Sequence, residues 1–286
     1  MRLIRGAALI ALVILLTTTS CADPVPSSSA DGGPTPTNEP MVVLVIGDSI
    51  PFNSPDDCPG CTGFADSFAK ALATEGKGEV TVRNRSRHDG AKTQDIAKQL
   101  GVDKNLIAEL GTADVVLLSF GFNDQPPYAS GGSPCQSVKE SDDDAAFVSG
   151  LAGTTAECMD SKTQDLRALS TTILSRVREL SPNSSVGVLN SYNSWIGWEA
   201  ASKYPDKVTA VAEKSAYALD AWNTALCNEA AAIKAACLDI YHAFNGVDGR
   251  SPAGVLLAAD YTHPSQAGND AITKVLLASE TLKTGR

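Results

Sequence analysis

Positive charge is scarce in this sequence. Its 286 residues include 23 Lys and Arg against 33 Asp and Glu, which gives a formal net charge of −10 at pH 7. Nucleic-acid binding depends on concentrated Lys and Arg that contact phosphates, so the composition argues against a nucleic-acid partner. A negatively charged membrane surface would be a poor electrostatic partner for the same reason. The hydrophobic fraction of 43% is enough to build a core, which argues against a disordered chain.

Long hydrophobic runs are also lacking near the start of the chain. The apolar run over residues 7–16 follows Arg2 and Arg5. As a helix it rises about 15 Å, about half of what spanning a bilayer requires. A charged start, a short apolar centre and small residues after it are typical of a secretory signal, which we place at residues 1–20.

The segment closes with Thr-Thr-Ser-Cys, ending at Cys21. This junction resembles the lipobox of bacterial lipoproteins, although Thr18 stands where that motif usually has Leu. The resemblance implies a lipid on Cys21 and a location at the outer face of the bacterial cell membrane or cell wall, or partial secretion. Secretion without lipid and a retained anchor are the alternatives. Residues 21–40 are rich in Pro and Ser and predict a tether, which leaves residues 41–286 as one domain.

The cysteines are odd in number. Seven are present, so they cannot all pair within the chain. A lipid on Cys21 would leave six, an even number that suits an oxidising compartment. Six cysteines allow 15 connectivities, and we expect local pairing because near neighbours bracket single loops or helix ends. The expected pairs are Cys58 with Cys61, Cys135 with Cys158, and Cys227 with Cys237.

Several functional motifs are missing as well. The chain has no Gly-x-Ser-x-Gly elbow, phosphate loop, dinucleotide fingerprint or His-rich metal pair. The three aspartates at residues 142–144 lack the loop spacing of a calcium site. We therefore expect neither a metal nor an organic cofactor, and a monomeric chain.

What the domain does contain is an alternation of strand and helix patterns. Short β-branched runs predict buried parallel strands, and amphipathic stretches between them predict helices. This alternation predicts an α/β fold, a three-layer α/β/α sandwich with a mainly parallel five-stranded, flavodoxin-like sheet. The expected strands cover residues 41–46, 79–84, 113–120, 185–190 and 237–241, and the expected helices cover 63–75, 93–110, 160–180, 206–236 and 265–283.

Three short motifs fall where ligands gather in such sheets, at strand ends. Gly-Asp-Ser occupies residues 47–49, Gly-Phe-Asn-Asp occupies 121–124, and Asp-Tyr-Thr-His occupies 260–263 before the last helix. In this order they resemble the SGNH (GDSL-type) hydrolase family, over about residues 42–282. The resemblance implies hydrolysis of esters by an activated serine.

The same chemistry follows from the residues themselves. A serine hydroxyl is a poor nucleophile and needs a base that takes its proton. His263 titrates near neutral pH and can serve Ser49 as that base, while Asp260, three residues earlier, can orient the ring. A helix start beside Pro264 is the simpler interpretation of His263, and its pairing with Ser49 favours catalysis.

The developing oxyanion also needs donors. We expect the backbone amide of Ser49 and the side-chain amide of Asn123 to serve, although Asn123 also suits a turn cap. The family resemblance implies a third donor, a glycine amide after the second strand. Gly90 matches best, in a loop about one residue longer than usual.

Four further polar residues near these motifs are given structural roles. We interpret Asp48 and Asp124 as turn caps and His242 as structural. His88 shares the Gly90 loop and could approach the site, and we prefer its interpretation as a solvated loop residue. Insertions at residues 51–63 and 125–158 flank the expected site, and aromatic residues in or near such loops are candidates to line its pocket. These are Phe52, Phe122, Tyr128, Tyr192, Trp195 and Trp198.

Together these features predict an extracytoplasmic serine esterase that acts on small-molecule, lipid or glycan esters through an acyl-enzyme on Ser49. Transfer of an acyl group to envelope polysaccharide is one alternative. A non-catalytic, glycan-binding surface lipoprotein is another, but such a protein would be expected to have lost a catalytic residue.

Overall fold

The computed structural model describes residues 39–124 and 144–283. The predicted signal segment, Cys21, nearly all of the tether, Tyr128 and Cys135 lie outside the described residues. Among the helices of the described ranges, none is both long enough and apolar enough to cross a membrane.

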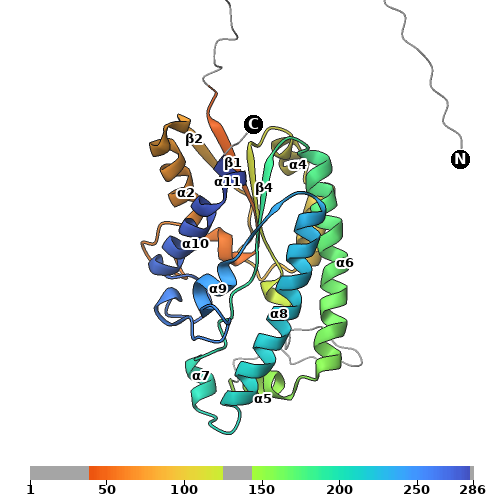
Figure 1. The fold of residues 1–286 in the computed structure, drawn as a ribbon, viewed down its shortest axis with the longest axis vertical. Helices are drawn as coiled ribbons and strands as arrows, with labels where there is room; N and C mark the ends of the chain where they lie inside the picture. Colours follow the sequence, from red (N-terminus) through yellow and green to blue (C-terminus); the bar gives the residue numbers. More distant parts are fainter. Residues whose placement is uncertain (1–38, 125–143, 284–286) are drawn as a thin grey trace, which may run out of the picture. The chain divides into compact units, whose positions relative to one another are not determined.

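A five-stranded sheet forms the centre of the domain (Figure 1). Its strand order is β2-β1-β3-β4-β5, and every neighbouring pair is parallel. The α/β class and the parallel sheet predicted from the sequence are confirmed. The strands are β1 Met41–Gly47, β2 Val80–Asn84, β3 Val115–Ser119, β4 Ser185–Leu189 and β5 Ala236–Leu238.

Both faces of the sheet are apolar. Successive side chains of a strand point to opposite sides of the sheet, and in β1 both sets are hydrophobic. In β1, Leu44 and Ile46 join one hydrophobic core, while Val43 and Val45 join the other. All four are fully buried. A strand covered on both faces reads as a continuous apolar run rather than an alternation, as β1 does.

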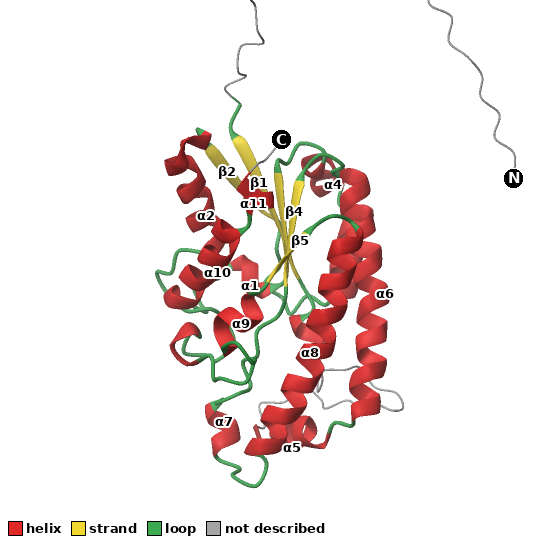
Figure 2. Cartoon of the chain, in the orientation of Figure 1, coloured by secondary structure: helices red, strands yellow, loops and turns green. Residues whose placement is uncertain are grey.

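Helices cover each face and complete the three layers (Figures 1 and 2). The core around Leu44 is covered by α3 Thr93–Val102, α4 Lys104–Leu110, α5 Asp144–Gly153, α6 Ala156–Leu180 and α8 Val208–Ala232. The core around Val43 is covered by α1 Ser49–Phe52, α2 Phe64–Leu72, α9 Ile240–Asn245, α10 Gln266–Ala278 and α11 Glu280–Lys283. Shorter elements are α7 Glu199–Ser202 and the single turns η1 Ala73–Lys77, η2 Phe122–Asp124 and η3 Gly254–Leu256.

Aspartate caps explain two departures from the predicted elements. The helix expected over residues 93–110 breaks into α3 and α4, because the Asp103 carboxylate accepts hydrogen bonds from the backbone amides of Asn105 and Leu106 and starts a new helix. The strand expected over 237–241 ends at Leu238, because Asp239 caps α9 in the same way. A capping carboxylate thus overrides an apolar run that propensity alone would continue.

Two disulfides lie within the described residues. They join Cys58 to Cys61 and Cys227 to Cys237, two of the three local pairs expected from the spacing. The first closes a short loop after α1, and the second ties the end of α8 to β5. The third expected pair includes Cys135, outside the described residues.

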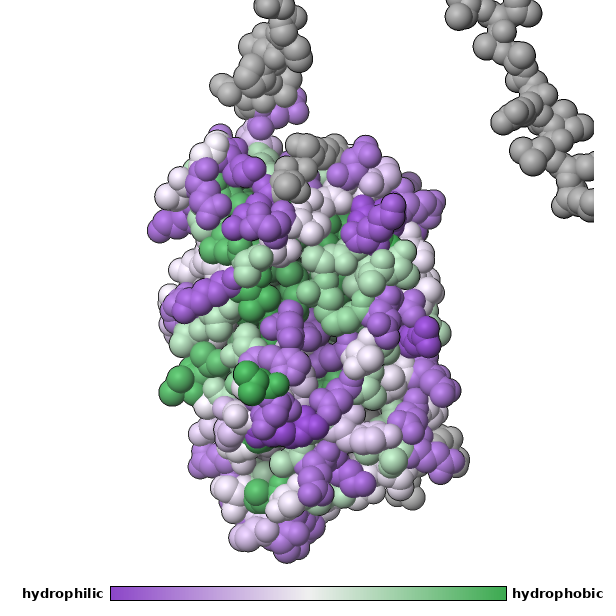
Figure 3. All heavy atoms as spheres, viewed as in Figure 1, coloured by the Kyte–Doolittle hydropathy of each residue, from purple (hydrophilic) through white to green (hydrophobic). Residues whose placement is uncertain are grey.

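The surface shows scattered apolar side chains among polar ones, as the face drawn in Figure 3 illustrates. Large apolar side chains exposed singly are normal on a globular domain. Two of them, Phe52 and Tyr261, lie beside sequence motifs expected to carry chemistry. The exposed set among the described residues is Phe52, Val102, Val208, Tyr217, Val247, Val255 and Tyr261.

Gly47 at the end of β1 provides a test of this packing. A Cβ at this position would overlap the Ser119 carbonyl oxygen of β3 and would lie 2.7 Å from the Pro51 Cγ atom. We expect Gly47→Ala to lower the free energy of unfolding by about 2–4 kcal/mol, measured by urea denaturation. The control Gly101→Ala lies in helix α3 with open space around it and should raise stability by about 0.5–1 kcal/mol. Equal effects of the two changes would contradict this account.

Candidate active site

Ser49 lies at the point where β1 ends and α1 begins. Asp48 caps this short helix, and its Oδ1 atom accepts a hydrogen bond of 3.1 Å from the backbone amide of Ile50. Its carboxylate also accepts from the backbone of Phe122, in the turn that follows β3. Asp48 therefore connects the Ser49 turn to the turn that carries Asn123. This agrees with its interpretation as a turn cap.

Asp260 and His263 form a compact unit on one turn. The Asp260 Oδ1 atom accepts from the backbone amides of Thr262 at 2.9 Å and His263 at 3.0 Å. Its Oδ2 atom lies 2.5 Å from Nδ1 of the His263 ring. Burial raises the pKa of Asp260, but the hydrogen bonds with His263 and the backbone outweigh it and lower the pKa overall. The ring is therefore held by a carboxylate that stays ionised.

The backbone between these two residues is in an unusual conformation. Tyr261 has a φ of 57°, in the left-handed region that non-glycine residues seldom adopt. Its hydroxyl donates to Glu199 Oε2 at 2.6 Å, and the buried Tyr192 hydroxyl donates to the Thr262 carbonyl at 2.7 Å. These two bonds fasten the turn from both sides. Strain of this kind persists where the surroundings determine the conformation, as they do at functional sites.

Ser49 and His263 line one small cavity together with Asp57. The His263 side chain is 16% exposed. Among the described residues, no group forms a hydrogen bond with its Nε2 atom. Burial lowers the pKa of His263, but the hydrogen bond with Asp260 and the charges of Asp260, Asp57 and Asp48 outweigh it and raise the pKa above 6.5. An oriented imidazole with an open ring nitrogen beside a serine is the arrangement that general-base catalysis needs.

Two of the expected oxyanion donors, Asn123 and Gly90, lie on turns that a hydrogen bond connects. Asn123, in η2, donates one side-chain N–H to the Ala91 carbonyl at 3.1 Å, and its amide carries a second N–H. Ala91 directly follows Gly90, which has a φ of 68° and no atom near the position a Cβ would take. Asp124 accepts from the backbone amide and hydroxyl of Thr93 at 2.6 and 2.7 Å, so it holds the turn after β3 against the start of α3, which agrees with its interpretation as a structural residue of these turns.

His88 is an exposed loop residue, as interpreted, and it also approaches the site. Its Nε2 atom lies 2.8 Å from Asp57 Oδ2, its ring stacks on Phe52, and its ring centroid is 6.1 Å from that of His263. Asp57 itself was missed by sequence reasoning. One aspartate in a Pro-rich loop carries no local signal of its own, and only folding brings it to His263.

His242 shows that an Asp-x-x-His spacing is not sufficient to identify a base. Its Nδ1 atom lies 2.6 Å from Asp239 Oδ2, as in the pair at residues 260 and 263. However, Asp239 is the cap of α9, and the His242 side chain is 46% exposed. This fits the structural role expected for His242. The cavity that His263 shares with Ser49 distinguishes the two pairs.

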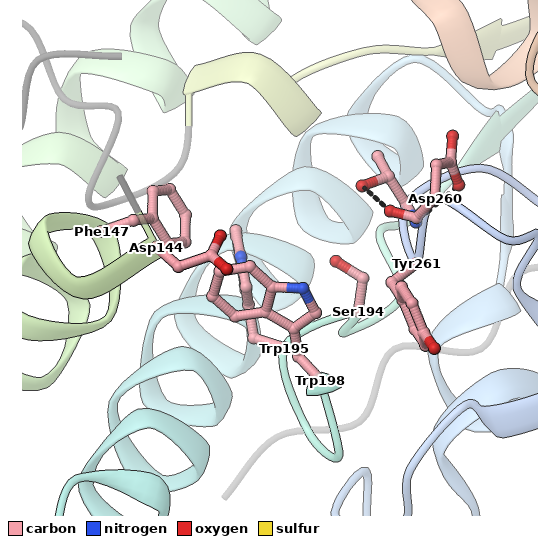
Figure 4. Close-up of a pocket in the computed structure, with 8 residues that line it drawn as sticks. Asp144, Phe147, Ser194, Trp195, Trp198, Asp260 and Tyr261 are labelled. Atoms are coloured by element: carbon pink, nitrogen blue, oxygen red, sulfur yellow. Dashed lines mark hydrogen bonds between the residues drawn. The ribbon is translucent and has the colours of Figure 1, made fainter. Parts of the chain in front are cut away.

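A second cavity of about 160 Å³ lies on the other side of Asp260. Figure 4 shows the two indoles between Asp144 and Phe147 on one side and Asp260 and Tyr261 on the other. Of the aromatic residues expected to line a pocket, Trp195 and Trp198 do so, whereas Phe122 and Tyr192 are buried in the core. The cavity is lined by Asp144, Phe147, Ser194, Trp195, Trp198, Asp260, Tyr261 and Thr262.

The buried Asp48 carboxyl predicts a dependence of stability on pH. It is fully buried, its Oδ2 atom lacks a partner among the described residues, and burial raises its pKa from 3.8 to about 7. The folded chain therefore binds this proton more tightly than the unfolded chain, so the stabilisation is present at low pH and is lost as the pH rises toward 7. Between about pH 5 and about pH 8, the wild-type free energy of unfolding should fall by about 2–3 kcal/mol more than that of Asp48→Asn.

Urea unfolding at both pH values measures this difference. Asp66→Asn, which alters an exposed carboxylate of α2, is the control and should retain the wild-type pH dependence. Parallel wild-type and Asp48→Asn curves would refute the assignment of a protonated, buried Asp48.

Comparisons with known proteins bear on the fold and the family of this chain. No curated protein sequence matches the chain. Among solved structures, a lipase from a goat rumen metagenome has a TM-score of 0.58 at 16% identity and covers 84% of this chain and 98% of its own. A phospholipase A1 from Streptomyces albidoflavus has a TM-score of 0.53 at 19% identity, and the match covers 84% of this chain and 99% of the phospholipase. An acetyl xylan esterase from Geobacillus stearothermophilus has a TM-score of 0.51 at 19% identity, and the match covers 85% of this chain and 96% of the esterase.

At these identities the structures show a common fold. The sequence pattern of the GDSL-like lipase/acylhydrolase family, in contrast, matches residues 45–271 and thus spans the three motifs from Ser49 to His263. The chain therefore belongs to the GDSL-like lipase/acylhydrolase family and is a hydrolase of the SGNH esterase and lipase type.

Proposed function

We propose that this chain is an extracytoplasmic serine esterase that hydrolyses carboxylic esters through an acyl-enzyme on Ser49. The observation that carries the proposal is the Asp260–His263 pair, because His263 lines one cavity with Ser49 and its Nε2 atom has no hydrogen-bond partner among the described residues. The assignment of the three residues to their steps follows from this geometry.

In the first half of the reaction, His263 Nε2 takes the proton of the Ser49 hydroxyl as the oxygen attacks the ester carbonyl carbon. The Asp260 carboxylate stabilises the imidazolium that forms. His263 then gives the proton to the departing alcohol, and the acyl group remains on Ser49. In the second half, His263 activates a water molecule that attacks the acyl-enzyme, which releases the acid and restores the serine.

Negative charge on the carbonyl oxygen would be met by the amides of Ser49, Gly90 and the Asn123 side chain. The bond from Asn123 to Ala91 supports this role because it holds the amide against the Gly90 loop. Donors positioned before the reaction need no rearrangement when charge develops, and one such donor contributes about 3–4 kcal/mol to transition-state stabilisation.

Location outside the cytoplasm is supported by the disulfides Cys58–Cys61 and Cys227–Cys237, since such bonds persist in oxidising compartments. The signal-like start supports it as well. In this proposal a lipid on Cys21 anchors the domain to the outer face of the cell membrane.

For the substrate, the 160 Å³ cavity beside Asp260 favours an acylated glycan over a long-chain lipid ester. It is smaller than the about 300–1,000 Å³ of a site that holds a drug-sized molecule. Its lining combines the indoles of Trp195 and Trp198 with carboxylates and hydroxyls. Aromatic faces and polar groups together suit one sugar ring better than a lipid chain.

Acyl transfer to a polysaccharide is the competing reaction, and it would require water to be excluded. The Asp260 side chain is 36% exposed, which leaves the site accessible to water and favours hydrolysis.

The triad predicts a covalent label. A fluorophosphonate probe should modify Ser49 of the wild-type chain, and peptide mass spectrometry should locate the label. Ser49→Ala and His263→Ala should each lower kcat/KM on p-nitrophenyl acetate by about 10³-fold or more without unfolding the chain. His242→Ala removes the matched histidine of the α9 cap and should retain activity. Absence of label on Ser49, together with no ester hydrolysis, would refute the proposed function.

The second cavity predicts substrate preference. Hydrolysis of p-nitrophenyl acetate should exceed that of p-nitrophenyl palmitate. Trp198→Ala should raise KM for an acetylated oligosaccharide by about tenfold, more than for p-nitrophenyl acetate, because it removes an aromatic face worth about 1 kcal/mol or more. Trp198→Phe keeps an aromatic face, so its KM for the acetylated oligosaccharide should lie between those of the wild type and Trp198→Ala. A preference for palmitate that Trp198→Ala leaves unchanged would favour a lipid ester.

A further inference from the structure

Three side chains meet beside the catalytic cavity, and two of them have no role in the ester chemistry. Asp57, His88 and His263 each present one ligand atom, and these three atoms lie within 4.8 Å of one another. They come from distant parts of the chain: the segment just before the Cys58–Cys61 disulfide, the loop after β2, and the turn before α10.

One separation is close to that of a zinc site, and a second is about half an ångström shorter. Two ligand atoms bound to a tetrahedral zinc ion at about 2.0–2.1 Å lie about 3.3–3.4 Å from each other. Asp57 Oδ2 lies 3.5 Å from His263 Nε2 and 2.8 Å from His88 Nε2. Small shifts of these side chains would therefore complete three of the four vertices, with the fourth left to water.

His263 is already oriented as a ligand. Its Nδ1 atom is held by the Asp260 carboxylate, so the Nε2 lone pair is directed away from Asp260. A carboxylate behind a histidine is the usual outer partner of a zinc-bound imidazole, since it sets the tautomer and strengthens the donor. The Nε2 atom is buried, and it has no hydrogen-bond partner among the described residues. A buried, unpartnered lone pair is the feature that a bound ion would satisfy.

The other two ligands are also held in place. Asp57 directly precedes the disulfide between Cys58 and Cys61, and the His88 ring stacks on Phe52 with centroids 5.2 Å apart. The side chains of Asp57 and His88 are 15% and 34% exposed, so the site is partly buried yet reachable from solvent. Two imidazoles and one carboxylate form a donor set that suits Zn²⁺ rather than Mg²⁺ or Ca²⁺.

We propose that Asp57, His88 and His263 bind one Zn²⁺ ion that reversibly inhibits the enzyme. Coordination uses the Nε2 lone pair of His263, which is then unable to accept the Ser49 proton. His88 coordinates through Nε2 as the neutral imidazole, so the proton that Nε2 shares with Asp57 is replaced by the ion and the ring carries its single proton on Nδ1. The inhibition rests on the proposed function, whereas the binding of the ion does not.

The test starts from chain stripped of metal with a chelator and then dialysed. Equilibrium dialysis with ZnCl₂ should show one ion per chain, and CoCl₂ should give the visible absorption of a tetrahedral Co²⁺ site. In parallel, Zn²⁺ should abolish hydrolysis of p-nitrophenyl acetate over the concentration range in which it binds, and a chelator should restore it. Failure to bind one ion at this site would overturn the proposal.

Matched variants locate the ion. His88→Ala should retain activity in the absence of metal, while its zinc affinity and its sensitivity to zinc both fall by about tenfold or more. Asp57→Ala should lose zinc affinity to a similar extent. His242→Ala and the neighbouring Asp56→Ala should bind as the wild type does. Equal zinc affinity in the wild type and His88→Ala would overturn the site. If zinc binds at this site but the metal-free chain has no esterase activity, the inhibition and the proposed function are overturned, and the site stands.

Discussion

The hydrogen bond between Asp260 and His263 is the interaction on which the chemistry of this domain depends. It occupies Nδ1 at 2.5 Å and thereby leaves Nε2 as the free ring nitrogen of a histidine that lines one cavity with Ser49. The negative charge also keeps the pKa of His263 raised against the effect of burial. The proposed general-base catalysis and the proposed zinc site would use the same lone pair, so each would exclude the other.

The backbone turn that carries Asp260 and His263 is held in place by the surrounding fold. Tyr261 holds a left-handed backbone conformation, and hydrogen bonds from its own hydroxyl and from Tyr192 fasten the turn to α7 and to the core. Asp48 plays the corresponding part at the other motifs, because its buried carboxylate joins the turn after β1 to the turn after β3. The carboxylates of Asp48 and Asp260 thus fix the turns of the site through hydrogen bonds. The hydrophobic cores fix the strands that these turns follow.

Much of this arrangement follows from local patterns. The parallel sheet could be predicted because buried strands read as short β-branched runs separated by helical stretches. The strand that was expected to continue to Tyr241 ends early because the Asp239 cap depends on side-chain geometry, which a propensity pattern does not represent. The break at Asp103 has the same cause. Short helices such as α1 and α7 carry too few residues for a periodic signal.

At the site, the sequence by itself pointed to Ser49, Asn123 and the Asp260–His263 pair as candidates, because each stands in a short motif at the end of a predicted strand or before a predicted helix. The tertiary structure supplied the physical distinction between His263 and His242, since both follow an aspartate by three residues and only His263 shares a cavity with Ser49. Only the tertiary structure decided that Asp57 and His88 lie close to His263. Their contact joins residues far apart in the chain, and the physical reason is that parallel strands bring their carboxyl ends, and the loops that follow, to one edge of the sheet.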